Sequence, residues 1–125
     1  MIKQLPSEKI KEYVKSNPKC VLLDVRTEEE WVSDGKPDGE TIGLKTYFLT
    51  IQFADKSFNQ NFIEDFKKLN IQKDSEILTM CMGGVRSQAA AELLTKENYK
   101  CVNISDGFLG NPENVGWKNS GLPCK

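Results

Sequence analysis

Short runs of apolar and β-branched residues alternate along the chain with segments of helical periodicity. Runs of this length are typical of strands buried on both faces of a parallel sheet. They span residues 20–25, 45–50, 76–80 and 100–104. Between two of these runs, Phe62, Phe66 and Leu69 recur at the spacing of an amphipathic helix. The alternation of strands and helices predicts an α/β fold with a mainly parallel sheet.

Start signals predict two further helices near the N-terminus. The first is expected to begin at Ser7, whose hydroxyl would cap it, and to end before Pro18. The second is expected after Thr27, because Thr27 and Glu30 have the spacing of a capping box. This second helix carries Trp31, which we interpret as a packing residue.

Length and charge narrow the class of protein. A chain of 125 residues without an internal repeat predicts one domain that spans residues 1–125. The net charge of -1 gives no overall field that would attract nucleic acid or an anionic membrane, so neither is expected as a partner. Residues 1–7 lack the apolar core of a signal peptide, which favours the cytoplasm. A leader removed in maturation would leave the same sequence, so the periplasm stays open.

Histidine is absent from the chain. Its absence removes Ser-His-Asp and Cys-His catalysis and any histidine-ligated metal site. The chain has four cysteines without a C-x-x-C pair, so neither a zinc knuckle nor a thioredoxin-type dithiol is indicated. We expect no metal site and reduced thiols. A catalytic cysteine would have to be activated by backbone amides, a helix dipole and arginine.

One cysteine differs from the others in its neighbours. Cys81 follows an apolar run and precedes a helix predicted over residues 86–96. Gly83 and Gly84 free the backbone to take positive φ, so several N–H groups can turn toward one point. The helix N-terminus favours an anion at that point, and Arg86 adds a positive charge. Cys81 is therefore predicted to be a thiolate and the catalytic residue. The residues expected to bind an anion beside it are Met82, Gly83, Gly84, Val85, Arg86 and Ser87.

Asp24 and Arg26 stand at the carboxyl end of another predicted strand, where ligands bind in parallel sheets. We predict that they form a salt bridge that fixes the neighbouring loops, with a place for Arg26 in the pocket as the alternative. Cys20 and Cys101 each open a predicted strand and are interpreted as core residues, whereas Cys124 belongs to the tail.

Three motifs follow one another along the chain: Leu23-Asp24-Val25-Arg26, Cys81-x-x-Gly84-x-Arg86-Ser87 and Asp106-Gly107-Phe108. With Trp31, Trp117 and Gly121-Leu122-Pro123, they make the chain resemble a single-domain rhodanese, a sulfurtransferase of the thiosulfate:cyanide type. The resemblance covers nearly the whole chain. It implies an open sheet of about five parallel strands flanked by helices, with Cys81 as the sulfur-carrying nucleophile.

The resemblance also implies a reaction. Cys81 would take sulfane sulfur from a small sulfur-containing anion such as thiosulfate, or from a persulfidated protein, and pass it to cyanide or a thiol. No metal or organic cofactor is implied. Two features depart from the family. The segment Gly-His-Ile-x-Gly-Ala is replaced by Gly39-Glu40-Thr41-Ile42-Gly43-Leu44. The loop also carries no charge before Arg86, which makes it a poorer trap for a doubly charged anion such as thiosulfate.

Two alternatives remain open at the level of sequence. Phosphatases and arsenate reductases also place a cysteine and an arginine around an anion-binding loop, but with five intervening residues, whereas four lie between Cys81 and Arg86 here. A ring one residue shorter leaves less room for a tetrahedral oxyanion, so this alternative ranks below sulfur transfer. The other alternative is a non-catalytic persulfide carrier or redox-sensing module, which would look almost the same in sequence.

Overall fold

Five parallel strands form one open sheet in the order β1-β5-β4-β2-β3 in the computed structural model, which describes all residues from Met1 to Lys125. Each neighbouring pair of strands is parallel. The strands are β1 (Lys3–Leu5), β2 (Val21–Asp24), β3 (Lys45–Phe48), β4 (Glu76–Met80) and β5 (Lys100–Ile104). The predicted α/β fold with about five parallel strands is confirmed.

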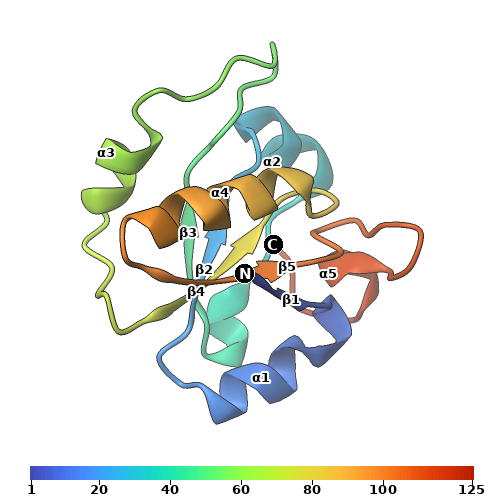
Figure 1. The fold of residues 1–125 in the computed structure, drawn as a ribbon. Coiled ribbons are helices and arrows are strands. Elements are labelled where there is room, and N and C mark those ends of the chain that lie inside the picture. The colour runs from blue at the N-terminus through green and yellow to red at the C-terminus, as the bar shows by residue number, and fades with distance from the viewer.

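Helices lie on both faces of this sheet (Figure 1). The α-helices are α1 (Ile10–Ser16), α2 (Glu28–Asp34), α3 (Phe62–Lys67), α4 (Val85–Lys96) and α5 (Gly116–Asn119), and two short 3-10 turns are η1 (Ser7–Lys9) and η2 (Gly39–Ile42). None of them combines the length and the apolar composition that a membrane crossing needs. The capping box predicted for α2 is present, with Thr27 and Glu30 binding each other's backbone N–H groups.

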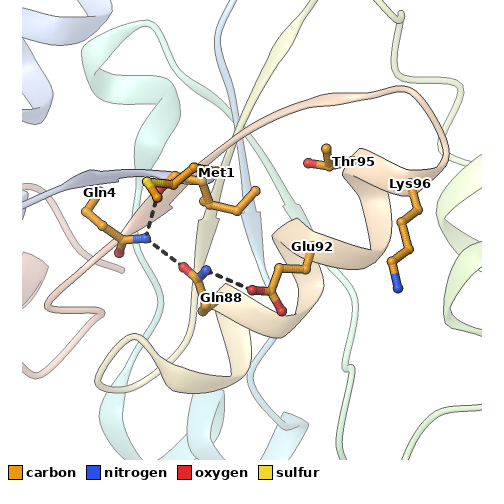
Figure 2. A pocket seen from close by; sticks show the side chains of 7 residues that line it. Met1, Gln4, Gln88, Glu92, Thr95 and Lys96 are labelled. Atoms are coloured by element: carbon orange, nitrogen blue, oxygen red, sulfur yellow. Dashed lines mark hydrogen bonds between the residues drawn. The ribbon is translucent and has the colours of Figure 1, made fainter.

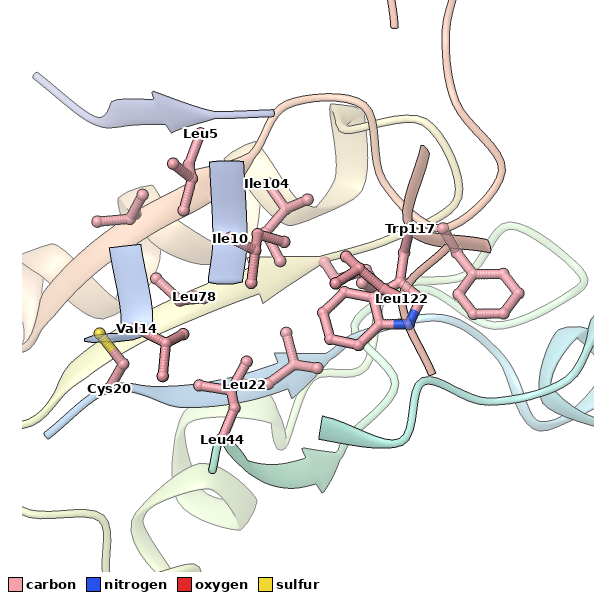
Figure 3. Close-up of a cluster of buried hydrophobic side chains, with 13 residues drawn as sticks. Leu5, Ile10, Val14, Cys20, Leu22, Leu44, Leu78, Ile104, Trp117 and Leu122 are labelled. Carbon is pink, nitrogen blue, oxygen red and sulfur yellow. The ribbon is translucent and has the colours of Figure 1, made fainter. Parts of the chain in front are cut away.

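Strand β2 shows why the apolar runs are continuous. Leu22 packs in a cluster with residues of α1 and α5 (Figure 3), whereas Leu23 packs in a second cluster with residues of α3 and α4. Both leucines are fully buried. Successive side chains of a strand point to opposite faces, so β2, which is covered on both faces, is apolar from Val21 to Leu23, and the buried Asp24 at its end is paired with Arg26. Burial of each leucine stabilises the fold by about 1.5–3 kcal/mol.

The N-terminal segment differs from its prediction. Lys3–Leu5 pair with β5 as an edge strand, and α1 begins only at Ile10, after η1. Ser7 does not cap a helix, because its N–H and its hydroxyl both donate to Asp106 Oδ1, at 3.0 and 2.9 Å. The predicted N-cap is therefore wrong: a carboxylate distant in sequence binds the hydroxyl, and a local pattern cannot reveal such a partner.

Candidate active site

Cys81 lies at the carboxyl edge of the sheet, directly after β4, which is paired with β2 on one side and β5 on the other. The chain then passes through a tight loop into α4, which begins at Val85. The structure thus shows the predicted order of strand, loop and helix. In an open parallel sheet this edge is where ligands bind, because the loops that follow the strands meet there.

Two polar groups contact the sulfur of Cys81, which otherwise lies in a buried apolar cluster. The N–H of Gly84 donates to Sγ at 3.1 Å, and the hydroxyl oxygen of Ser87 lies 3.3 Å from Sγ. Only 1% of the surface of Cys81 is exposed. The structure therefore brings together Cys81, Gly84 and Ser87, three of the residues that the sequence analysis grouped into one site.

The loop offers further donors. The backbone N–H groups of residues 82, 83 and 85–87 donate to no acceptor within the protein, in contrast to that of Gly84. Residues 85–87 form the first turn of α4, where unpaired N–H groups and the positive end of the helix dipole favour an anion. They make the loop beside Cys81 rich in free hydrogen-bond donors, which favour an anion.

Gly84 is required by two constraints. Its φ of +107° lies in a region that costs other residues free energy. A Cβ atom at this position would stand 2.3 Å from the carbonyl oxygen of Ser105. Only glycine therefore allows the loop to lie against the chain after β5 and to turn its N–H toward Cys81.

The segment after β5 fixes the loop from the other side. The N–H groups of Phe108 and Leu109 donate to the carbonyl oxygens of Cys81 and Met82, at 2.9 and 3.1 Å. Because that segment binds these two carbonyl oxygens, they do not accept hydrogen bonds from the N–H groups of the loop itself, which stay free. Asp106 in turn accepts hydrogen bonds from Ser7 and from the N–H of Gly116. The Asp106-Gly107-Phe108 motif thus supports the loop.

Arg86 is paired with a carboxylate. Its Nη1 and Nη2 donate to Glu30 Oε1 and Oε2, at 2.8 and 2.9 Å. Burial raises the pKa of Glu30, but the hydrogen bonds from Arg86 and Thr27 outweigh it and lower the pKa to about 2. The positive charge that the sequence predicts beside Cys81 is present, yet Glu30 balances it. The sequence analysis identified Glu30 only as a capping residue.

Asp24 and Arg26 form the predicted salt bridge, with 2.9 Å between Oδ2 and Nη2. Both side chains are fully buried, and Arg26 also donates to the carbonyl of Gly35 at 2.9 Å. Its guanidinium lies 4.1 Å from the ring centre of Phe108. This pair therefore joins the segments that follow β2, α2 and β5 and forms no hydrogen bond with Cys81, which favours the structural role over a place in the pocket.

The other thiols have less favourable surroundings for a negative charge. Burial raises the pKa of Cys101 to about 11 and also raises that of Cys124. Burial and the nearby Glu76 carboxylate raise the pKa of Cys20 to about 12. All four cysteines are free.

The sequence analysis also missed Asn103, which contacts the site directly, and Gln4, which binds Asn103 from behind. Asn103 of β5 binds Ser87 through Oδ1 at 2.6 Å and the carbonyl of Gly84 through Nδ2 at 3.1 Å. Gln4 of β1 accepts a hydrogen bond from Asn103 Nδ2 at 2.8 Å. One signal was visible: Asn103 is an uncharged polar residue in the middle of an apolar run, and such a residue needs partners once it is buried.

An open five-stranded parallel sheet that holds one cysteine in a loop of backbone amides defines a recognisable class of α/β protein. The sequence model of the family described as Rhodanese-like domain matches residues 7–110. The chain belongs to this family.

Individual relatives agree with this assignment. The Rickettsia prowazekii protein RP600, described as uncharacterized, is 41% identical over 108 residues, which are 86% of this chain and 84% of that protein. An Allochromatium vinosum protein named sulfurtransferase is 23% identical over 124 residues, 98% of this chain and 94% of that protein. The crystal structure of Rv0390 from M. tuberculosis superposes with a TM-score of 0.85 at 30% identity and covers 98% of this chain and 96% of that one.

Proposed function

We propose that the protein is a sulfurtransferase that carries sulfane sulfur as a persulfide on Cys81. The observation that carries the proposal is the environment of Cys81 Sγ, which accepts the N–H of Gly84 while five further loop amides have no internal acceptor. Such donors stabilise a sulfur anion and a departing anion without a general base. Membership of the rhodanese-like family and the similarity to a protein named sulfurtransferase support the same reaction.

The reaction has two displacements. The Cys81 thiolate attacks the outer sulfur of the donor, so that a new S–S bond forms. The bond between that sulfur and the rest of the donor breaks, and its electron pair leaves with the donor: sulfite leaves when thiosulfate is the donor. An acceptor nucleophile such as cyanide then attacks the outer sulfur of the persulfide, which forms thiocyanate and returns the Cys81 thiolate. No external oxidant or reductant takes part.

The charge balance around the loop favours a donor whose reacting group carries less negative charge than the dianion thiosulfate. Arg86 is the one charged residue between Cys81 and Ser87, and Glu30 neutralises it. A persulfide on a protein or a small thiol therefore fits this loop better than the dianion thiosulfate, because its binding does not rely on an unpaired cation. A protein thiol is the corresponding acceptor.

Mass spectrometry of the intact protein tests the proposal. After incubation with an alkyl persulfide, the wild-type protein should gain one sulfur atom that maps to Cys81 and is lost on addition of cyanide. Cys81→Ser should abolish this gain, a reduction of more than about 1,000-fold in loading rate, because the nucleophile is removed. Cys20→Ser, which removes a buried thiol outside the loop, is the matched control and should load normally.

Two results would contradict the proposal: sulfur that maps to another cysteine, or a Cys81→Ser variant that still loads. Steady release of thiocyanate would identify an enzyme that turns over, whereas loading followed by transfer only to a protein thiol would identify a carrier. Steady hydrolysis of an aryl phosphate that requires Cys81 would instead favour the phosphatase alternative.

A further inference from the structure

The hydroxyl of Ser87 faces two acceptors but has one hydrogen to donate. Its Oγ lies 3.3 Å from Cys81 Sγ and 2.6 Å from Asn103 Oδ1. Cys81, Ser87 and Asn103 are each at most 2% exposed, so water does not compete for this hydrogen. Whichever acceptor binds the hydrogen leaves the other without it.

The orientation of the Asn103 amide follows from its other partners. Nδ2 faces the carbonyl of Gly84 at 3.1 Å and Gln4 Oε1 at 2.8 Å. The Gly84 carbonyl can only accept a hydrogen bond, so the NH2 group of Asn103 must point to it. The oxygen of Asn103 therefore points to Ser87, where it can only accept.

The chain of hydrogen bonds continues from Gln4 to the surface (Figure 2). Gln4 Nε2 donates to Gln88 Oε1 at 2.6 Å, and Gln88 Nε2 donates to Glu92 Oε2 at 3.1 Å. Each amide thus accepts on its oxygen and donates from its nitrogen, in one direction that ends at a carboxylate. Donation toward an anion makes each amide oxygen a better acceptor, so the chain strengthens the hold of Asn103 on the Ser87 hydrogen.

We propose that Asn103 is a positioning residue that sets the reactivity of Cys81 by competing with it for the Ser87 hydroxyl hydrogen. At rest the Ser87 hydroxyl donates its hydrogen bond to Asn103 Oδ1, and the sulfur of Cys81 accepts its hydrogen bond from the N–H of Gly84. The hydroxyl hydrogen of Ser87 turns from Asn103 to Cys81 only when the sulfur carries enough negative charge to compensate for leaving Asn103 Oδ1 buried without a hydrogen bond. This inference rests on the proposed function for its significance, because it describes how the nucleophile of that reaction is held back between transfers.

Alkylation of Cys81 by iodoacetamide at pH 7 tests the competition without any sulfur transfer. Asn103→Leu keeps a similar side-chain volume but removes the acceptor, so the Ser87 hydrogen is free to bind the Cys81 thiolate. The released Ser87 hydrogen stabilises the reactive thiolate form of Cys81. A hydrogen bond to a charged atom is strong enough for Cys81 to alkylate about tenfold faster in this variant than in the wild type. Cys124, an exposed thiol in the same molecule, provides the internal standard.

A second pair of variants separates this effect from a general loosening of the loop. When Ser87→Ala is already present, adding Asn103→Leu should change the alkylation rate of Cys81 by less than about twofold, since no hydroxyl hydrogen remains to be released. If Asn103→Leu only loosened the loop, it would accelerate alkylation of Cys81 equally in the presence of Ser87 and in the Ser87→Ala variant. Asn103→Ala replaces the leucine variant if that variant does not fold, with the same two results expected.

The proposal is overturned if removal of the Asn103 oxygen leaves Cys81 no faster, or if it accelerates Cys81 to the same extent with and without Ser87. Neither outcome bears on whether Cys81 accepts sulfur, which the mass measurement decides independently. The two proposals can therefore fail separately.

Discussion

Cys81 and Cys20 are both buried, 1% and 4% exposed, but they lie at opposite ends of the sheet. Cys81 follows the carboxyl end of β4 and accepts a backbone N–H. Cys20 precedes the amino end of β2 and donates to Glu76 Oε1 at 3.9 Å. In a parallel sheet, helix N-termini gather at the carboxyl ends of the strands, so N–H donors are concentrated beside Cys81. Burial alone therefore does not decide what a cysteine can do.

Each end also contains a carboxylate, and the two are used differently. Glu30 binds Arg86 and Thr27, which neutralises its charge beside the loop. Glu76 has no cation within salt-bridge distance and is bound by the hydroxyl of Tyr13 and the thiol of Cys20. Burial and the charge of Glu76 together raise the pKa of both of these groups. The carboxyl end of the sheet is thus suited to a sulfur anion, and the amino end is not.

The largest expected difference is in alkylation of the thiols. At pH 7 a thiol with a pKa of about 12 is ionised to about one part in 10⁵, so iodoacetamide should label Cys81 at least about 100-fold faster than Cys20. Peptide mapping after brief treatment measures the order. The comparison fails if Cys20, Cys101 or Cys124 is labelled before Cys81. In Glu76→Gln, Cys20 should react several-fold faster because the nearby negative charge is gone, but burial should still keep Cys20 slower than Cys81.

Gly84→Ala should destabilise the protein by about 2–4 kcal/mol, because the strained φ and the collision with Ser105 add together. It should also slow alkylation of Cys81, since the donor N–H moves with the loop. Urea unfolding measures the first effect. Gly43→Ala is the matched control: its φ of +78° is also positive, but a Cβ there meets nothing within 4 Å, so a loss of about 1 kcal/mol is expected. Equal losses in both variants would refute the steric explanation.

Glu30→Gln should produce the smallest effect, a loss of about 1 kcal/mol at pH 7, because the pair with Arg86 is partly exposed. Glutamine can keep the capping box, so the change isolates the charge. The folded pKa of Glu30 is lowered from 4.5 to about 2, so its contribution is complete above about pH 5 and is lost as the pH falls toward about 2.

Urea unfolding at a series of pH values measures this difference between wild type and variant. The difference should shrink between about pH 5 and pH 2. Glu29→Gln is the control, because Glu29 forms no salt bridge and its neutralisation should change the free energy of unfolding by less than about 0.5 kcal/mol. A difference that stays constant with pH would show that Glu30 acts through something other than its charge.

The stretch from β4 through the loop to α4 could be predicted because its signals are contiguous. An apolar run, two glycines and a helix start each have a local physical meaning, and together they place donors next to Cys81. The same reasoning found the capping box of α2 and the Asp24–Arg26 pair, whose members lie within three residues of each other. It failed for Ser7, since the partner of that hydroxyl is Asp106.

Local sequence patterns are enough to predict the alternation of strands and helices, the position of Cys81 after a strand, and the four residues between it and Arg86. Which groups meet at Cys81 depends on how the chain folds. The tertiary structure brings Glu30 from α2 to Arg86 and Asn103 from β5 to Ser87, across 56 and 16 residues. The physical reason is that periodicity and turn chemistry act over a few residues, whereas these contacts depend on the order of the strands in the sheet.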